Sequence, residues 1–408
     1  MKTKEFKLKK VKSHQIKELK EDIKKNIKDP RQLGKKVYKI WDIVIVVILA
    51  VLCDCNEWEE IEDFAKSKKK LLSRFLKLTG GIPRAKTYER VISIVDSTVL
   101  NSIFVKFIMK IKFTYNKEFK DILSFDGKVD KGSSRAANEK RDNIKPLNVL
   151  NVYSDKLQYC IEQEMIEDKT NEIPTIPILI ERLNLKGVIC TWDALNTQTD
   201  NVKAVIENGG DYIVALKANQ KTCYEDVRDY FDEERLKLLR IGYEGSYLVE
   251  NEKSQSKVIK YEYYQTEQIE WYEDKGKWCK LRSIGLVKKT SIDTKGKESV
   301  EIRYYISSIF TNIRVFSEAI RKHWNVENKL HWHLDFTFRS DNNTTMNKKA
   351  LFNLQIIKKF DLKILNEAKE AYGNKSLKRI RKDIARDIEV ELIKIFNIIR
   401  KSSNFGSS

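Results

Sequence analysis

Cysteine, proline and glycine are scarce in this sequence, and it lacks long apolar runs. The six cysteines form no CxxC pair and show no regular spacing, which argues against a disulfide framework or a zinc site. Five prolines and fifteen glycines exclude collagen-like and linker-rich chains. The longest apolar run, Ile43–Cys53, has 11 residues, whereas a membrane span needs about 20. We therefore expect a soluble, cytoplasmic protein with reduced thiols, in which this run is a buried core helix.

Positive charge, by contrast, is abundant. The 408 residues include 78 Lys and Arg against 59 Asp and Glu, a net charge of +19. Most of the excess lies at the two ends, with 15 basic against 5 acidic residues in 1–40 and 13 against 7 in 356–401. This distribution favours a polyanionic partner, nucleic acid before membrane. Solvated lysine-rich helix faces explain either end, taken singly, equally well.

The N-terminal quarter predicts an all-α domain, which we assign to residues 1–115. Apolar residues recur there at helical spacing, and we expect helices over 38–53, Trp58–Ser67, Lys70–Thr79 and Lys86–Lys112. The sequence GGIPR separates the last two, and Thr87 is the expected N-cap of the final helix.

From about residue 116 the pattern becomes that of an α/β fold. Short apolar runs such as Leu147–Tyr153 predict strands, and Gly187–Trp192 and Asp211–Leu216 are apolar enough to be buried on both faces. The order strand–helix–strand predicts a mixed sheet. We divide this part into the first part of a core (116–222), a β-rich insertion (223–314), the second part of the core (315–370) and a basic helical tail (371–408).

Three carboxylates are candidates for chemistry. Asp126 follows ILSF and Asp193 follows VICTW, so we expect both at the carboxyl ends of strands, where the functional residues of open α/β sheets gather. Glu327 lies in the helical segment Arg321–Phe338 and shares a helix face with apolar residues such as Leu334. We therefore expect Glu327 to face the core, where an uncompensated carboxylate costs several kcal/mol and needs a cation.

Two aspartates and a glutamate make an all-oxygen site of the kind that Mg²⁺ prefers. Two such ions about 4 Å apart activate a water or hydroxyl and stabilise the leaving oxygen of a phosphoryl transfer. With a basic surface, this site predicts chemistry on nucleic acid. Zinc bound by His323, Glu327 and His331 is a weaker alternative, because three ligands spread over two helical turns close poorly around one ion.

Other interpretations of the acids stay open. A structural ion pair between Glu327 and Arg321 accounts for that glutamate without any chemistry. Asp335 and Asp341 are rivals for the place of the third acid. Glu172 is expected to be a loop carboxylate or a support for a ligand.

Several sequence blocks occur in order along the chain. They are FDGK (125–128), KTNEIPTIP (169–177), TWDALNTQ (191–198), GGDYIVALKANQ (209–220), YYISS (304–308) and HWNVENKLHWHLDFTF (323–338). Together they resemble the H-repeat-associated transposases, which belong to the DDE transposases of bacterial insertion sequences. Upstream, DPR (29–31) and GGIPRAKTYERV (80–91) resemble the helical domain that precedes the catalytic domain in that family.

The resemblance implies an RNase H-like catalytic core interrupted by the β-rich insertion, with Asp126, Asp193 and Glu327 as the catalytic, metal-binding acids. It implies two Mg²⁺ or Mn²⁺ ions, cleavage at the terminal inverted repeats of an element, and strand transfer into target DNA. The partner would be double-stranded DNA in the bacterial nucleoid, bound by a dimer or larger assembly. The DNA contacts that we expect are made by Lys128, Lys217, Asn219, Gln220, Arg321, His323, Asn328 and His331.

The block around the third acid departs from the family pattern. Related transposases often show a Tyr-Arg-Glu-Lys arrangement around the glutamate, but here His323 lies four residues before Glu327 and Leu334 lies seven after it, so the arrangement is not met literally. Two further hypotheses about function therefore stay open. One is a DNA-binding remnant or repurposed copy that does not cleave, and the other is a general metal-dependent nuclease without an element of its own.

Overall fold

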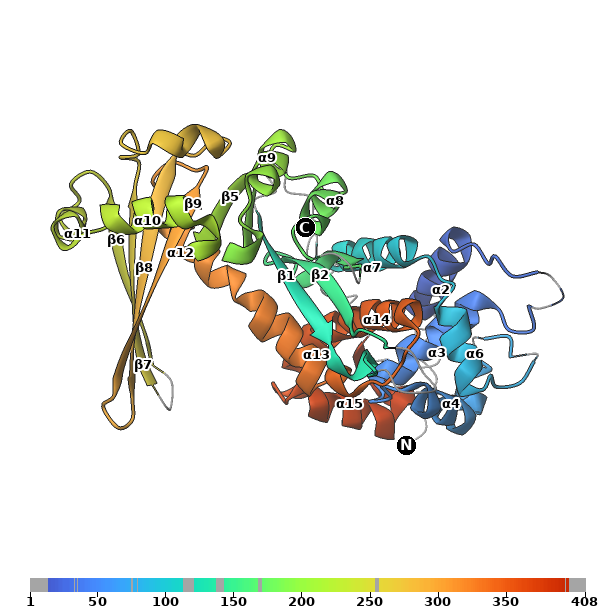
Figure 1. The fold of residues 1–408 in the computed structure, drawn as a ribbon. Helices are drawn as coiled ribbons and strands as arrows, with labels where there is room; N and C mark the ends of the chain where they lie inside the picture. The colour runs from blue at the N-terminus through green and yellow to red at the C-terminus, as the bar shows by residue number, and fades with distance from the viewer. Residues whose placement is uncertain are drawn as a thin grey trace, which may run out of the picture.

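The computed structural model describes residues 14–395, apart from 33, 35, 75, 79, 113–120, 137–142, 168–170, 254–256 and 393. Residues 1–13 and 396–408, which carry part of the basic excess, lie outside the described residues. In the described part, helices pack on both faces of one large sheet (Figure 1).

The sheet has nine strands in the order β3-β2-β1-β4-β5-β9-β8-β7-β6. The bounds are β1 Asp121–Asp130, β2 Leu147–Ser154, β3 Tyr159–Met165, β4 Val188–Trp192, β5 Asp211–Leu216, β6 Ser246–Lys253, β7 Lys257–Thr266, β8 Ser283–Asp293 and β9 Glu298–Ser307. β2 is antiparallel to β1 and β3, whereas β4 is parallel to both β1 and β5. The first five strands in this order form the RNase H-like core, which confirms the predicted fold class.

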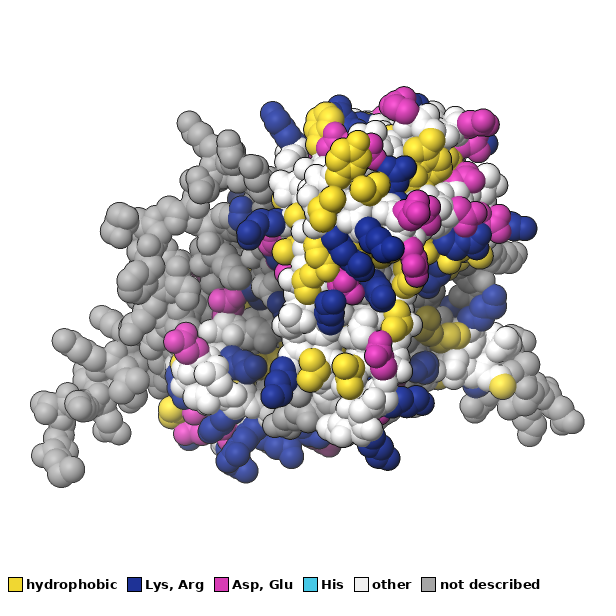
Figure 2. Space-filling view, turned by 90° about the vertical axis from the view of Figure 1, so that its left-hand side faces the viewer, with side chains coloured by type: hydrophobic (Ala, Val, Ile, Leu, Met, Phe, Trp, Pro, Cys, Tyr) yellow, Lys and Arg dark blue, Asp and Glu magenta, His cyan; other side chains and the backbone are white. Residues whose placement is uncertain are grey.

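The β-rich insertion extends the core sheet. β9 pairs antiparallel with β5, and β8, β7 and β6 follow as an antiparallel meander. The edge strand β6 was not predicted, because its residues are all partly or fully exposed and give no apolar alternation. At this end of the molecule Lys and Arg lie among acidic and apolar side chains, without a surface of one sign (Figure 2).

The N-terminal helices are α2 His14–Asn26, α3 Ile40–Leu52, α4 Trp58–Ser67, α5 Lys69–Leu72, α6 Ala85–Ile92 and α7 Ser97–Lys112. Every residue of α3 except Trp41 is buried, which confirms the predicted core helix. The helix expected over Lys86–Lys112 is in fact two, because the Asp96 side chain accepts the Val99 N–H (2.9 Å) and caps α7. Thr87 is not an N-cap, since α6 begins after Arg84.

The remaining helices are α8 Thr175–Glu181, α9 Thr199–Glu207, α10 Lys221–Tyr230, α11 Glu233–Arg240, α12 Ile313–His323, α13 Trp332–Phe336, α14 Lys348–Ala368 and α15 Leu377–Arg386. α14 is buried along most of its length and packs on α3, α6 and α7. Neighbouring residues of β2 face different cores: Val149 packs with these helices, and Leu150 packs with α8 and α9. The N-terminal and C-terminal helices therefore share one core on one face of the sheet.

Among the described residues, no single helix is long and apolar enough to cross a membrane. α6 and α7 pass that test only as a pair, bent by 88° between them.

Candidate active site

Asp126 and Asp193 lie side by side on neighbouring strands. The parallel pairing of β1 with β4 ends at Phe125 and Trp192, and each aspartate is the next residue along the chain. Adjacent strands are about 4.8 Å apart, so the sheet brings these two predicted acids together. Asp126 does not end its strand as expected, because β1 continues along β2 to Asp130.

Each aspartate is contacted by a histidine from the C-terminal helical segment. His331 Nδ1 lies 3.2 Å from Asp126 Oδ2, and His323 Nε2 lies 3.5 Å from Asp193 Oδ1. His323 Nδ1 is also 3.1 Å from Thr191 Oγ1. The two histidines that we expected at the DNA thus contact the acids, each a different one, which also argues against a zinc ion shared between them.

The surroundings of Asp193 favour its charged form. Its hydrogen bond with His323 lowers the pKa of this carboxyl below its ordinary value, although burial acts in the opposite direction. The positive charges of Lys217 and Arg303 lower this pKa further. Lys217 is exposed, so a cation stands in solvent beside the acid, as a phosphate-binding residue should.

Glu172 belongs to the same site. Its Oε2 accepts a hydrogen bond from Asn196 Nδ2 (2.7 Å), and its carboxylate occupies the space into which a Cβ on Gly127 would project. Burial raises the pKa of Glu172, and the charges of Asp126 and Asp193 raise it further. The sequence showed Glu172 only as a loop carboxylate, because its neighbours come from β1 and from the loop after β4.

Glu327 differs from its prediction. It is exposed, whereas Val326 and Leu330 are buried. The reason is that Val326–His331 forms a π-helical turn, which widens the helix by one residue and shifts the α-helical spacing on which the core-facing stripe was based. Glu327 lies midway in sequence between the two histidines that contact the aspartates, on a turn that packs against β1.

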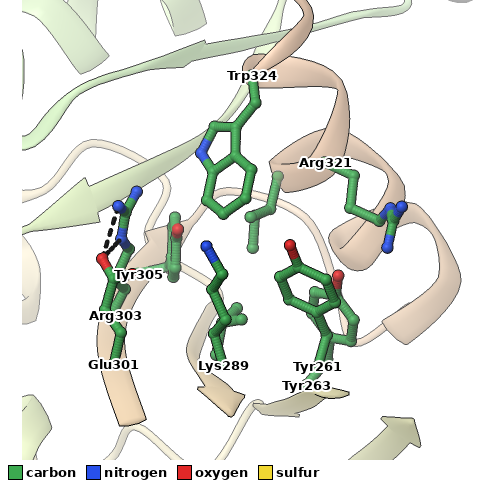
Figure 3. Close-up of a pocket in the computed structure, with 10 residues that line it drawn as sticks. Tyr261, Tyr263, Lys289, Glu301, Arg303, Tyr305, Arg321 and Trp324 are labelled. Atoms are coloured by element: carbon green, nitrogen blue, oxygen red, sulfur yellow. Dashed lines mark hydrogen bonds and ion pairs between the residues drawn. The ribbon is translucent and has the colours of Figure 1, made fainter. Parts of the chain in front are cut away.

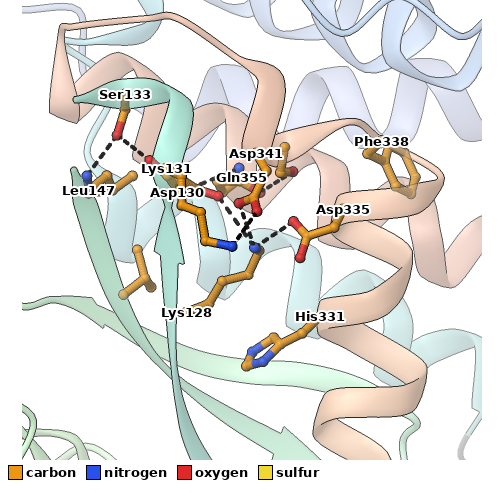
Figure 4. A network of polar contacts seen from close by, with 12 residues as sticks. Lys128, Asp130, Lys131, Ser133, Leu147, His331, Asp335, Phe338, Asp341 and Gln355 are labelled. Atoms are coloured by element: carbon orange, nitrogen blue, oxygen red, sulfur yellow. Dashed lines mark hydrogen bonds and ion pairs between the residues drawn. The ribbon is translucent and has the colours of Figure 1, made fainter. Parts of the chain in front are cut away.

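The two rival acids, Asp335 and Asp341, both contact Lys128. Asp335 Oδ1 lies 2.6 Å and Asp341 Oδ1 lies 3.4 Å from Lys128 Nζ, which is also 3.8 Å from Asp130 (Figure 4). Lys128 is 8% exposed. This lysine is therefore committed to a buried ion-pair network, and we withdraw it from the expected DNA contacts.

Three of the other expected DNA contacts have partners within the protein. Arg321 pairs with Glu250 (3.0 Å) and with Glu252, both on β6.

Asn219 donates a hydrogen bond to the Ala194 carbonyl (2.8 Å), and Gln220 donates to the Thr197 carbonyl (3.0 Å). The two amides tie the loop after β5 to the loop after Asp193, which is a positioning role. Asn328 is exposed.

The insertion contributes an aromatic and cationic cluster next to Asp193. Lys289 Nζ lies 5.0 Å and the Arg303 guanidinium 5.1 Å from the centre of the Trp324 ring (Figure 3). Tyr261 contacts the same indole edge-on. Trp324 is thus a packing residue, and it joins α12 to the insertion strands.

Trp332, in contrast, lies on the surface. It is 51% exposed and stacks on Phe336, which is 54% exposed, with 4.7 Å between the ring centres. Lys378 Nζ lies 5.5 Å from the Phe336 ring. The residue after His331 thus begins an exposed aromatic pair with a cation beside it.

Among the described residues, no group of three or more His, Cys, Asp or Glu side chains is arranged closely enough to hold a metal ion. The site nevertheless gathers oxygen ligands of the kind that Mg²⁺ prefers. Two aspartates stand together with a third carboxylate, Glu172, and the positive charge of the exposed Lys217 acts on Asp193. The strand order and the parallel β1–β4 pairing, with Asp126 and Asp193 past its end, define the class of proteins with an RNase H-like fold.

Comparison with known proteins identifies the family within that class. The family model described as "Transposase DDE domain" matches residues 88–360, and the model described as "DDE_Tnp_1-associated" matches residues 23–108. The chain therefore belongs to the DDE transposase family.

Individual relatives agree with the family. The chain is 30% identical over 362 residues to "Putative transposase YncI" of Escherichia coli O157:H7, which covers 88% of this chain and 90% of that protein. It is 31% identical over 323 residues to "H repeat-associated putative transposase YhhI" of Escherichia coli K12, and this alignment covers 77% of this chain and 82% of that protein. A piggyBac transposase in a synaptic complex with hairpin DNA aligns at 12% identity and a TM-score of 0.38, over 97% of this chain and 80% of that one.

Proposed function

We propose that the protein is an insertion-sequence transposase that cleaves DNA at the terminal inverted repeats of its element and joins the ends to target DNA. The observation that carries the proposal is the position of Asp126 and Asp193, side by side past the end of the β1–β4 ladder. Membership of the DDE family supports the reaction class, and the net charge of +19 supports a nucleic-acid partner.

The donor set fits Mg²⁺ or Mn²⁺. Mg²⁺ is usually bound by one or two carboxylates together with waters and substrate phosphate oxygens, rather than by a cage made only of protein. This mode of binding is compatible with two neighbouring aspartates, even though no complete cluster of ligands is preformed among the described residues. We propose that Asp126, Asp193 and Glu327 hold two ions. Such ions supply an activated water or hydroxyl and stabilise the leaving oxygen.

The protein's own groups position these acids and the DNA. His331 and His323 each fix one aspartate oxygen. We propose that Lys217, which is exposed, contacts a DNA phosphate beside Asp193. Because an element has two ends that must be processed together, we propose at least a dimer on the DNA.

Strand cleavage by the purified full chain tests this proposal. The substrate is duplex DNA that carries the inverted repeats, with Mg²⁺ or Mn²⁺ present. Asp126→Ala, Asp193→Ala and Glu327→Ala should each abolish cleavage but leave DNA binding intact, whereas the exposed control Glu207→Ala should cleave normally. Cleavage that persists in one of the three variants removes that residue from the site.

The same assay separates the two other hypotheses. A DNA-binding remnant would bind in a salt-sensitive way and cut under no divalent ion. A general nuclease would cut DNA without the repeats and would never join strands.

A further inference from the structure

We propose that Lys359 is a positioning residue of the site: through Asn151 it fixes the tautomer of His331 and thereby directs a hydrogen bond onto Asp126. The inference rests on the proposed function only for its consequence in catalysis. Its structural part concerns four side chains in contact with one another.

Lys359 lies on α14 and is 2% exposed. Lysine is rarely buried to this extent unless it is paired with an acid. Here its Nζ donates instead to two amide oxygens, Asn151 Oδ1 on β2 and Gln163 Oε1 on β3. The ammonium group of a lysine has donors and no acceptor, so it fixes which end of each amide faces it.

The orientation of the Asn151 amide determines which group it presents to His331. Because its Oδ1 faces Lys359, its Nδ2 faces His331 and lies 3.2 Å from Nε2. Nδ2 only donates, and its two hydrogens have three acceptors within reach: Nε2, the Val149 carbonyl (3.2 Å) and the Asp126 carbonyl (3.4 Å). A neutral ring can face this donor only with its acceptor nitrogen, which puts the ring hydrogen on Nδ1. That hydrogen points at Asp126 Oδ2, 3.2 Å away.

The amides on the Gln163 side of Lys359 have donor and acceptor orientations that agree with this assignment. Gln163 presents Oε1 to Lys359, and its Nε2 donates to Asn101 Oδ1 (3.2 Å). Asn101 Nδ2 in turn donates to the Ile161 carbonyl (2.8 Å). Each amide is thus in the orientation that its neighbour requires. A contact from Asn151 Nδ2 to the Val149 carbonyl (3.2 Å) supports the same orientation.

A neighbouring lysine provides the matched control. Lys358 is also fully buried on α14, but its Nζ donates to the Phe338 carbonyl (3.2 Å). Lys358→Met and Lys359→Met therefore remove a buried amine from the same turn, and only the second interrupts the path to His331.

The experiment is NMR of the full chain labelled with ¹⁵N-histidine, using two-bond ¹H–¹⁵N spectra that distinguish protonated from unprotonated ring nitrogens. The chain has four histidines, so His331→Gln assigns the signal. We expect the Nδ1–H tautomer in the wild type and in Lys358→Met, and an additional Nε2–H population in Lys359→Met. In the isosteric Asn151→Asp the new carboxylate only accepts from His331, so Nε2 should carry a hydrogen as well, and the ring should be protonated on both nitrogens between two carboxylates.

Strand cleavage at saturating DNA gives the second readout. Losing such a supporting contact typically costs about 10- to 100-fold in activity, and we expect a loss of that size for Lys359→Met but not for Lys358→Met. A pure Nδ1–H tautomer of His331 in Lys359→Met overturns the proposal. A pure Nδ1–H tautomer in Asn151→Asp overturns it as well, and this second variant decides the question if Lys359→Met does not fold. A wild-type chain that never cleaves contradicts the proposed function, but the tautomer measurement still decides this inference.

Discussion

The Glu172 carboxylate lies against Gly127 in the space that a side chain there would fill. Gly127 directly follows Asp126, so the backbone of β1 carries one acid and makes room for another. Close packing therefore brings the carboxyl groups of the site together, and the position of Glu172 depends on the absence of a Cβ at Gly127.

Gly127→Ala should disturb the site without unfolding the protein. The added methyl group must push Glu172 away from its hydrogen bond with Asn196, and displacements of this kind cost about 10- to 100-fold in rate. Strand-cleavage rates measure the effect. Gly276→Ala, with nothing within 4 Å of its added Cβ, is the control and should cleave like the wild type.

Lys217→Ala and Arg321→Ala should distinguish a cation that has no ion-pair partner among the described residues from a cation that is paired. Lys217 is exposed beside Asp193, whereas Arg321 is neutralised by Glu250 and Glu252. Losing a phosphate contact reduces the slope of log K against log salt by about 1, and we expect this for Lys217→Ala only. DNA-binding isotherms at several salt concentrations give the slopes, and an equal change in both variants would contradict the assignment.

Lys128→Met should destabilise the fold. The lysine is buried between Asp130, Asp335 and Asp341, and removing one partner of a buried ion pair costs about 3 kcal/mol or more. The free energy of unfolding in urea measures the loss. Lys131→Met is the matched comparison, because Lys131 also contacts Asp341 (3.3 Å) but is mostly exposed, and it should change stability by less than about 1 kcal/mol.

Asp361→Asn should stabilise the protein, and increasingly so as the pH rises. Asp361 is fully buried, neither of its carboxylate oxygens has a hydrogen-bond partner in the described part of the chain, and burial raises its pKa well above the ordinary value.

The folded state therefore keeps a proton that the unfolded state loses above about pH 4, so this residue lowers stability as the pH increases from there. We expect little difference at pH 3.5 and a gain of about 1–3 kcal/mol at pH 7. Thermal or urea unfolding across this range gives the result. The gain should be absent in the exposed control Asp200→Asn, and a gain that is independent of pH would contradict the explanation.

Much of the core could be predicted because its signals are local. The apolar runs that predicted β4 and β5 need only their own residues to be recognised, and both strands appear within one residue of their expected bounds. Since the residue that follows such a run emerges at the edge of a sheet, Asp193 was found from the sequence alone. The neighbouring position of Asp126 then depends only on parallel pairing.

The parts that were missed depend on partners far away in the chain. Nothing near Lys128 reveals that Asp335 and Asp341 will neutralise it. Glu172 joins the site only through β1 and Asn196. The exposed position of Glu327 follows from a π-helical turn, and periodicity analysis assumes a regular helix in which such a turn cannot occur.

The central claim is that Asp126, Asp193 and Glu327 together hold divalent ions. The most direct test is the number of Mn²⁺ ions bound to the protein–DNA complex, measured by electron paramagnetic resonance during a Mn²⁺ titration. We predict two ions for each active site in the wild type, and the loss of at least one when any of the three acids is replaced by alanine. Unchanged numbers and affinities of bound Mn²⁺ in all three variants would contradict the account.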